Sequence, residues 1–401
     1  MFKVAFSFKE GGVVRFSNFV FWMVLLAFIF EAIVMPVSIV FDIGFSLGYD
    51  SGFFARFGYV FIFIVGVFVL FVFCHRNWLW FWSFALILVG LSIGFYEGYE
   101  SGKWVAHVFY VLMPPVVFSL GYYFAKLVSV NVYYQTVFLA AVRFSALVVA
   151  IVVAVFSLAS KAGLSSYNAI GLSAFLFAAP FLYTKNAWFF VAFCILAFLA
   201  GKSTVFGALV ASGFIFYAIR GSALFRCIVL FGSLIFLLLI YVSDLEFVNN
   251  HRTVNALSSL LQGDFESFSS GRWSEAQAML QAFKSPFDWV FGLGYGATFV
   301  PWSDSPDYLS HYVHFGNLTW LYINGLLGYT VFLCFLLYVL SVNIKIISNS
   351  GDMVAVAVSV VVISLLILSA FGAVLMTSSL IWLFIGWSIA NYHYDIKWNT
   401  R

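Results

Sequence analysis

The side chains best suited to chemistry in this chain of 401 residues are a few cations and histidines that stand beside apolar segments. Arg272 begins a segment with helical periodicity, so its guanidinium could hold phosphate oxygens through two N–H groups, beside the free amides of a helix start. His314 stands just before a long apolar segment, and a histidine titrates close enough to neutral pH to take a proton from a hydroxyl group. Arg272 and His314 are therefore the candidates for stabilising an anionic leaving group and for general base catalysis.

Four further side chains are candidates for substrate binding. Arg252 is a second cation in the same polar segment, and Lys202 begins an apolar segment, where a charge near membrane depth is costly and usually functional. His311 would share a helical face with His314, but no third ligand accompanies the pair, so we expect no metal and no cofactor. Trp273 could stack on a sugar ring or anchor at the membrane interface.

Alternating glycines follow the same region. Gly292, Gly294 and Gly296 do not form the dinucleotide-binding pattern, and we expect them to let the backbone approach another segment or a substrate. Gly294 and Gly296 are accordingly included among the candidates for substrate binding. Gly325 and Gly328, in a predicted span, should permit close helix packing.

Other charges in and near this region have a simpler interpretation. Arg143 lies within a predicted span, where an ion pair with Glu31 is favoured over contact with a substrate phosphate. Acid pairs could bind a divalent cation, but solvated loop charge is the expectation for all of the following: Asp244, Glu246, Asp264, Glu266, Glu275, Asp288, Asp304 and Asp307.

The composition indicates that these residues sit on a membrane protein. Hydrophobic residues make up 64% of the chain and charged residues 9%, against about 25% charged in soluble domains. A soluble enzyme, a disordered chain and a disulfide scaffold are excluded, and no basic block suggests nucleic acid as a partner. The four cysteines are dispersed and give no disulfide or zinc signal.

Twelve segments are apolar and long enough to be candidate membrane-spanning helices. Two boundaries stay open: 187–219 could form one bent helix or a tight hairpin, and 353–391 could form one span plus a re-entrant piece. The candidates are 17–40, 57–74, 78–96, 105–125, 136–159, 168–184, 187–201, 203–219, 224–243, 317–342, 353–371 and 374–391.

The distribution of lysine and arginine predicts that both termini face the cytoplasm. This orientation places eleven basic residues inside and four in the short outer loops. The chain then divides into spans one to nine (1–243), an outer loop (244–316) and spans ten to twelve (317–401). Chemistry on the outer side has no nucleotide substrate, so it must use a substrate already activated in the membrane.

The outer loop has the features of a functional segment. Its 73 residues hold 11 of the 35 charges and three of the six histidines, and structureless loops of this length are uncommon. Apolar residues at helical spacing predict an amphipathic helix at about 271–284, ended by Pro286, and a second helix at about 253–262.

Four segments, in chain order, resemble motifs of the O-antigen polymerase and O-antigen ligase superfamily of bacterial membrane glycosyltransferases. They are Gly-Lys-Ser-Thr at 201–204, Ser-Gly-Arg at 270–272, Ser-Pro with Gly-x-Gly-x-Gly at 285–296, and His314 with Leu318, Gly325 and Gly328. Two departures are Lys202, near where an arginine is usual, and Phe315, where the family has an asparagine. The resemblance covers about residues 190–330.

The resemblance implies a GT-C-like, all-α polytopic fold in the bacterial inner membrane, with short helices in a periplasmic loop. It implies metal-independent transfer of an oligosaccharide from undecaprenyl diphosphate, with Arg272 on the diphosphate and His314 as the base. The expected partners are that lipid-linked donor, an acceptor glycan or lipid A-core, membrane lipid and a chain-length regulator.

Three functions remain open at this stage. A polymerase that joins lipid-linked repeat units is favoured, and a ligase that transfers the glycan to lipid A-core shares its motifs. A transporter of lipid-linked oligosaccharide is the alternative from another class, but it predicts repeated halves and charges at the bundle centre, which the sequence lacks.

Overall fold

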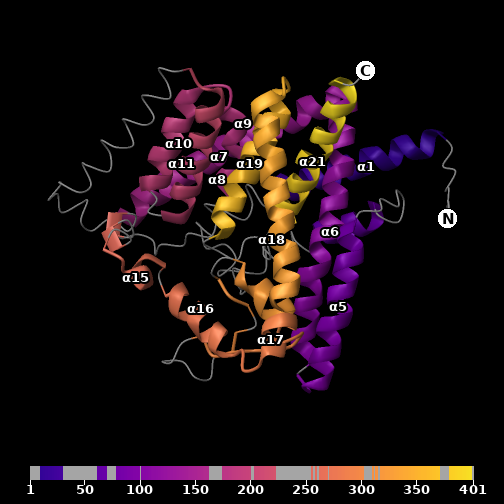
Figure 1. Cartoon of the computed structure of the whole chain (residues 1–401). Coiled ribbons are helices and arrows are strands. Elements are labelled where there is room, and N and C mark those ends of the chain that lie inside the picture. Colours follow the sequence, from indigo (N-terminus) through magenta and orange to yellow (C-terminus); the bar gives the residue numbers. More distant parts are fainter. Residues whose placement is uncertain are drawn as a thin grey trace.

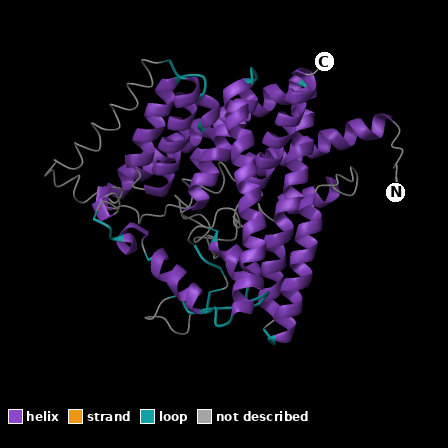
Figure 2. Ribbon diagram, in the orientation of Figure 1, coloured by secondary structure: helices purple, strands orange, loops and turns teal. Residues whose placement is uncertain are grey.

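The chain folds into a bundle of helices. A computed structural model describes residues 10–29, 61–69, 78–99, 101–161, 174–199, 203–222, 254–255, 258–259, 262–269, 271–301, 309–310, 312–314, 317–370 and 379–399. Regular structure in these residues is helical (Figure 2), apart from one β-bridge between Phe299 and Ser310.

Four of the described helices are long and apolar enough to cross a membrane, which agrees with the expected all-α membrane protein. These are α6 (Ser101–Val130), α7 (Val132–Lys161), α18 (Leu318–Asn349) and α19 (Met353–Ala370). Around them stand α1 (Glu10–Ile29), α5 (Trp78–Tyr96), α8 (Ala174–Ala178), α9 (Pro180–Tyr183), α10 (Ala187–Leu199), α11 (Ser203–Arg220) and α21 (Ser379–Asn399). The number of twelve spans stays a prediction, and the candidate at 224–243 lies outside the described residues.

The segments 187–219 and 353–391, whose division the sequence leaves open, each contain two separate helices. The rings of Phe190 and Tyr217 lie 5.4 Å apart, and those of Phe198 and Phe206 lie 5.7 Å apart. Since residues near the start of α10 face the end of α11, the two helices form an antiparallel hairpin. The 353–391 stretch contains two helices, α19 and α21, which contact each other.

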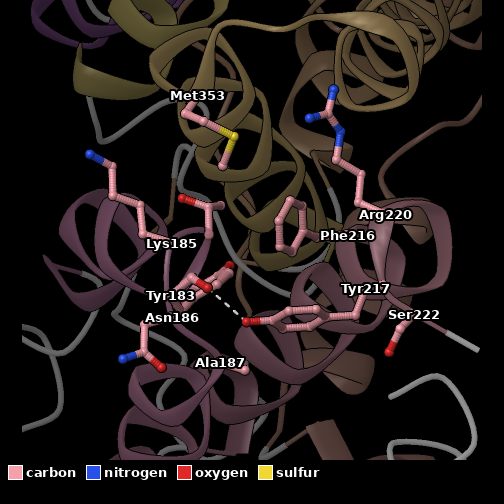
Figure 3. A pocket seen from close by; sticks show the side chains of 11 residues that line it. Tyr183, Lys185, Asn186, Ala187, Phe216, Tyr217, Arg220, Ser222 and Met353 are labelled. Atoms are coloured by element: carbon pink, nitrogen blue, oxygen red, sulfur yellow. Dashed lines mark hydrogen bonds between the residues drawn. The ribbon is translucent and has the colours of Figure 1, made fainter. Parts of the chain in front are cut away.

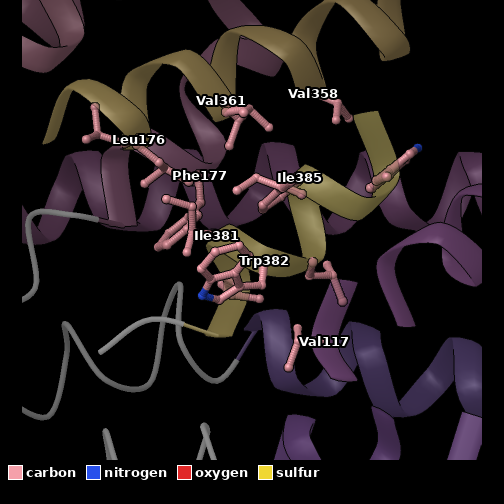
Figure 4. Packing of buried hydrophobic residues seen from close by; sticks show 14 of the residues in the cluster. Val117, Leu176, Phe177, Val358, Val361, Ile381, Trp382 and Ile385 are labelled. Atoms are coloured by element: carbon pink, nitrogen blue, oxygen red, sulfur yellow. The ribbon is translucent and has the colours of Figure 1, made fainter. Parts of the chain in front are cut away.

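The tightest packing in the bundle joins α6 to α21. A Cβ atom added at Gly121 of α6 would lie 2.0 Å from the carbonyl oxygen of Leu383, and one added at Gly386 of α21 would lie 2.1 Å from that of Phe118. Small residues at such a crossing let two backbones approach, so that dispersion contacts hold the pair together. Ile381, Trp382 and Ile385 of α21 then pack among Val117, Leu176, Phe177, Val358 and Val361 from α6, α8 and α19 (Figure 4).

The described residues of the polar segment 271–314 lie at one end of α18, and the connection between α18 and α19 lies at the other (Figure 1). At the second end, the guanidinium of Arg220 donates to the carbonyl oxygens of Ile347 and Ser350. At the first end, the polar segment contacts the end of α5 and the start of α6. The predicted topology likewise separates Arg220 from the polar segment; which end faces the cytoplasm stays a prediction.

Candidate functional site

The helix predicted at 271–284 is present as α16 (Arg272–Gln281). Gly271 precedes it with a φ of 83°, a conformation that glycine adopts without strain. The carboxylate of Glu266, on α15 (Phe265–Ser269), accepts from the backbone N–H of Ser274 at 3.0 Å and from its hydroxyl at 2.7 Å. One free amide of the first turn, that of Ser274, is therefore satisfied by an acid from the preceding helix.

The centre of the site is a pair formed by Glu275 of α16 and His314. Nδ1 of His314 lies 3.0 Å from Oε1 of Glu275, and the backbone N–H of His314 donates to Oε2 at 3.0 Å. The Glu275 side chain is 1% exposed, whereas that of His314 is 36% exposed. The buried acid thus holds a histidine that reaches the surface.

This geometry determines which nitrogen of His314 can act as a base. Both oxygens of Glu275 face nitrogens of His314, and a carboxylate oxygen beside Nδ1 favours the tautomer that carries its proton on Nδ1. With Nδ1 donating to Glu275, Nε2 keeps its lone pair and can accept a proton. A carboxylate behind the ring also stabilises the imidazolium that proton transfer would create.

His314 is positioned by short-range contacts before α18. The backbone N–H of Val313 donates to Oγ1 of Thr319 at 2.8 Å, and that hydroxyl donates back to the Val313 carbonyl at 3.2 Å. Asn317 begins α18 with a φ of 58°. The ring of Tyr312 stands edge-on to the imidazole, with centroids 4.7 Å apart. The backbone before His314 is therefore held by Thr319, and its ring is held by Tyr312.

Arg272 lies in the first turn of α16, one turn before Glu275, and its side chain is half-buried. Residues three apart on a helix are neighbours on its surface, so Arg272 and the Glu275–His314 pair belong to one region. Trp273 is 40% exposed, and its ring centroid lies 6.1 Å from that of Phe265. The other three binding candidates, Lys202, Arg252 and His311, lie outside the described residues.

The alternating glycines let the backbone approach other segments of the chain, which is one of the two roles predicted for them. Gly292, Gly294 and Gly296 all have positive φ, between 80° and 97°. The N–H of Gly296 donates to Nδ1 of the buried His107 on α6 at 3.0 Å, and a Cβ at Gly294 would lie 2.7 Å from Ile93 of α5. Gly294 and Gly296 are buried, and the atoms nearest to them belong to α5, to α6 and to Tyr99 between these helices.

Gly325 has a different role from the helix packing predicted for it. It interrupts α18 with φ 63° and ψ −171°, and a Cβ there would lie 2.3 Å from the carbonyl oxygen of Val290. The N–H of Leu293 donates to the Tyr322 carbonyl at 2.9 Å, which satisfies an acceptor beside the break. The loop therefore packs into the kink of α18, while a Cβ at Gly328 would lie 3.1 Å from Leu86 of α5.

The expectation of solvated loop acids is wrong for Glu275. The signal that could have identified it is its spacing: positions 275, 279 and 283 repeat every four residues, and Met279 and Phe283 are buried apolar residues. Asp264 and Glu266 are exposed, as expected. Asp288 forms a capping box with Ser285 at the start of α17 (Pro286–Phe291).

Arg143 is exposed on α7, and its predicted partner Glu31 lies outside the described residues. The described part of the chain contains no group of three or more His, Cys, Asp or Glu side chains that could hold a metal ion. Comparison with models of known families, with curated proteins and with solved structures finds no match.

Proposed function

We propose that this chain is a glycosyltransferase that joins undecaprenyl-diphosphate-linked oligosaccharide repeat units at the outer face of a bacterial inner membrane, as an O-antigen polymerase does. The observation that carries the proposal is the buried Glu275 behind His314, one helical turn from Arg272. A histidine held by a buried carboxylate is suited to repeated proton transfer, and an adjacent guanidinium is suited to a phosphate.

In the proposed reaction, Nε2 of His314 takes the proton from an acceptor hydroxyl group. The hydroxyl oxygen bonds to C1 of the donor sugar as the bond from C1 to the diphosphate oxygen breaks. The electron pair of that bond leaves with undecaprenyl diphosphate, whose negative charge Arg272 stabilises. Glu275 stabilises the protonated His314 until its proton returns to solvent.

Single substitutions of the two groups test this function in the host cell. His314→Ala and Arg272→Ala should abolish long surface glycan on gels while the protein is made in normal amount. His393→Ala and Lys284→Ala are matched controls, because they remove an exposed histidine on α21 and an exposed cation of the same outer segment. Both controls should keep the full ladder.

The pattern of loss distinguishes the acceptors. A single repeat left on the core means that polymerisation has failed, whereas a core without any repeat means that the chain is the ligase. Full-length ladders from both His314→Ala and Arg272→Ala would rule out the proposed chemistry.

A further inference from the structure

A pocket of about 360 Å³ lies at the end of the bundle opposite the Glu275–His314 pair. It is formed by the turn between α9 and α10, the last turn of α11 and the first residue of α19. Residues that line it include Tyr183, Lys185, Phe216, Tyr217, Arg220 and Met353 (Figure 3). Because α18 begins at Leu318, shortly after His314, and ends beside the carbonyl groups that Arg220 binds, the pocket and the candidate site are separated by the length of that helix.

The charge of the pocket is positive. Lys185 and Arg220 are the only charged residues among the described residues that line it, and they lie on opposite sides with the ring of Phe216 between them (Figure 3). Lys185 is exposed, so its ammonium group is accessible from solvent or from a lipid surface. No acid is among the described residues that line the pocket, and the nearby Asp352 accepts from the backbone N–H of Val354 at the start of α19. Two cations in this lining favour an anion between them.

Arg220 is held in place by contacts that leave part of its guanidinium unused. Its Nε and Nη2 donate to the carbonyl oxygens of Ile347 and Ser350, at the end of α18. A guanidinium carries five N–H groups, so these two bonds fix its plane without exhausting its donors. An anion would therefore meet a preorganised cation at this side and an adaptable lysine at the other.

One wall of the pocket is aromatic, whereas Thr184, Asn186 and Ser222 add polar groups to its lining. Phe216 and Tyr217 are buried in its wall, and the hydroxyl of Tyr217 donates to the Tyr183 carbonyl at 2.7 Å. Trp188 and Phe189, at the start of α10 beside the pocket, are exposed. Exposed aromatic residues at a helix end are typical of a membrane interface, and basic pockets between spanning helices bind anionic headgroups.

We propose that this pocket binds an anionic phospholipid, with the phosphate between Lys185 and Arg220 and the glycerol and upper acyl chain against Phe216. The bound lipid would join the α10–α11 hairpin to the connection between α18 and α19. The buried ring of Phe216 in its wall and the exposed rings of Trp188 and Phe189 next to it along the chain suit a lipid better than free phosphate.

The test uses the purified full chain in a mild detergent after removal of native lipid. Native mass spectrometry counts bound lipid, and thermal unfolding measures stabilisation, with phosphatidylglycerol, phosphatidylcholine and inorganic phosphate as probes. Phosphatidylglycerol should bind and raise the unfolding temperature, whereas phosphatidylcholine and phosphate should do so much less. Lys185→Gln should weaken phosphatidylglycerol binding about fivefold, and Lys126→Gln, an exposed lysine on α6 at the same end, should leave it unchanged.

Three results would overturn the proposal. Equal binding of phosphatidylcholine would mean that charge is not recognised, and equal protection by inorganic phosphate would mean a site for a free anion. Equal weakening by Lys185→Gln and Lys126→Gln would mean general attraction to the surface. Lys185 is exposed, so its substitution should leave folding intact, which the unfolding temperature without lipid checks.

Discussion

Replacing Glu275 by Gln tests the carboxylate–histidine pair with the smallest change in shape. The wild-type carboxylate faces two N–H groups of His314, at 3.0 Å from the backbone nitrogen and 3.0 Å from Nδ1. Glutamine has one oxygen and one NH₂ group, so only one of the two positions can still accept: Oε1, 3.0 Å from Nδ1, or Oε2, 3.0 Å from the backbone nitrogen and 3.3 Å from Nδ1. If its oxygen keeps the backbone N–H, its NH₂ group faces Nδ1, and the ring proton must move to Nε2.

The expected magnitudes follow from this exchange. A hydrogen bond to a charged group contributes about 1.5–3 kcal/mol and a neutral one about 0.5–1.5 kcal/mol, so Glu275→Gln should destabilise the protein by roughly 1–2 kcal/mol. A proton on Nε2 of His314 occupies the lone pair that would accept the proton of the acceptor hydroxyl group. General base catalysis contributes about a hundredfold to ten-thousandfold, and the rate of transfer should fall by an amount in this range.

Nitrogen-15 NMR of labelled histidines in detergent measures the tautomer directly, and His314→Gln identifies the signal among the six histidines. The His314 ring should carry its proton on Nδ1 in the wild type and on Nε2 in Glu275→Gln. Glu266→Gln is the matched control, because it changes a carboxylate of the same segment that accepts from Ser274. An unchanged tautomer in Glu275→Gln would refute the assignment of Nδ1 to the carboxylate.

Three further predictions concern stability, measured by unfolding in detergent. Gly121→Ala should lower the free energy of unfolding by about 1–3 kcal/mol because its Cβ would lie 2.0 Å from a backbone oxygen of α21. Gly207→Ala, whose added Cβ would meet no atom within 4 Å among the described neighbours outside its own turn of helix, should raise it by about 0.5–1 kcal/mol. Equal effects of the two substitutions would contradict the close crossing. Gly292→Ala should destabilise the protein more than Gly207→Ala, since its φ is 83° and its Cβ would lie 2.5 Å from a backbone nitrogen of α18; similar stability would argue against the loop–helix contact. Desolvation raises the pKa of Asp288, but hydrogen bonds in the α17 capping box outweigh it and hold that pKa below its usual range. Its stabilisation should therefore be present above about pH 4 and be lost as pH falls through the lowered pKa, and Asp288→Asn should remove this part of the acid dependence.

The helices were predictable where hydrophobicity alone determines them. The predicted segments at 78–96, 203–219 and 353–371 agree closely with α5, α11 and α19, because uninterrupted apolar residues of this length have few alternatives in a membrane. The kink of α18 was not predictable in this way. Gly325 and Gly328 have the spacing of a helix-packing motif. The non-helical backbone of Gly325 is explained only by the loop backbone at Val290, which lies against it.

The candidate site was predictable in part, for a related reason. Arg272 and His314 stand out because such residues are rare in this chain and occupy motif positions. Glu275 is one of eight acids in the loop, and nothing in its residue type distinguishes it from the solvated ones. Its spacing with Met279 and Phe283 could have placed it on the buried face of α16, but that local pattern does not encode its contact with His314, 39 positions later in the chain.

The crossing of α6 and α21 has a consequence for biosynthesis. Gly386 follows Gly121 by 265 residues. At about 5–20 residues per second, roughly 13–53 s pass between the synthesis of the two glycines. During that interval α6 is in the membrane without its closest neighbour, and the groove at Gly121 is open to lipid or to other helices. The bundle is therefore completed late, when one of its last helices inserts against one of its early ones.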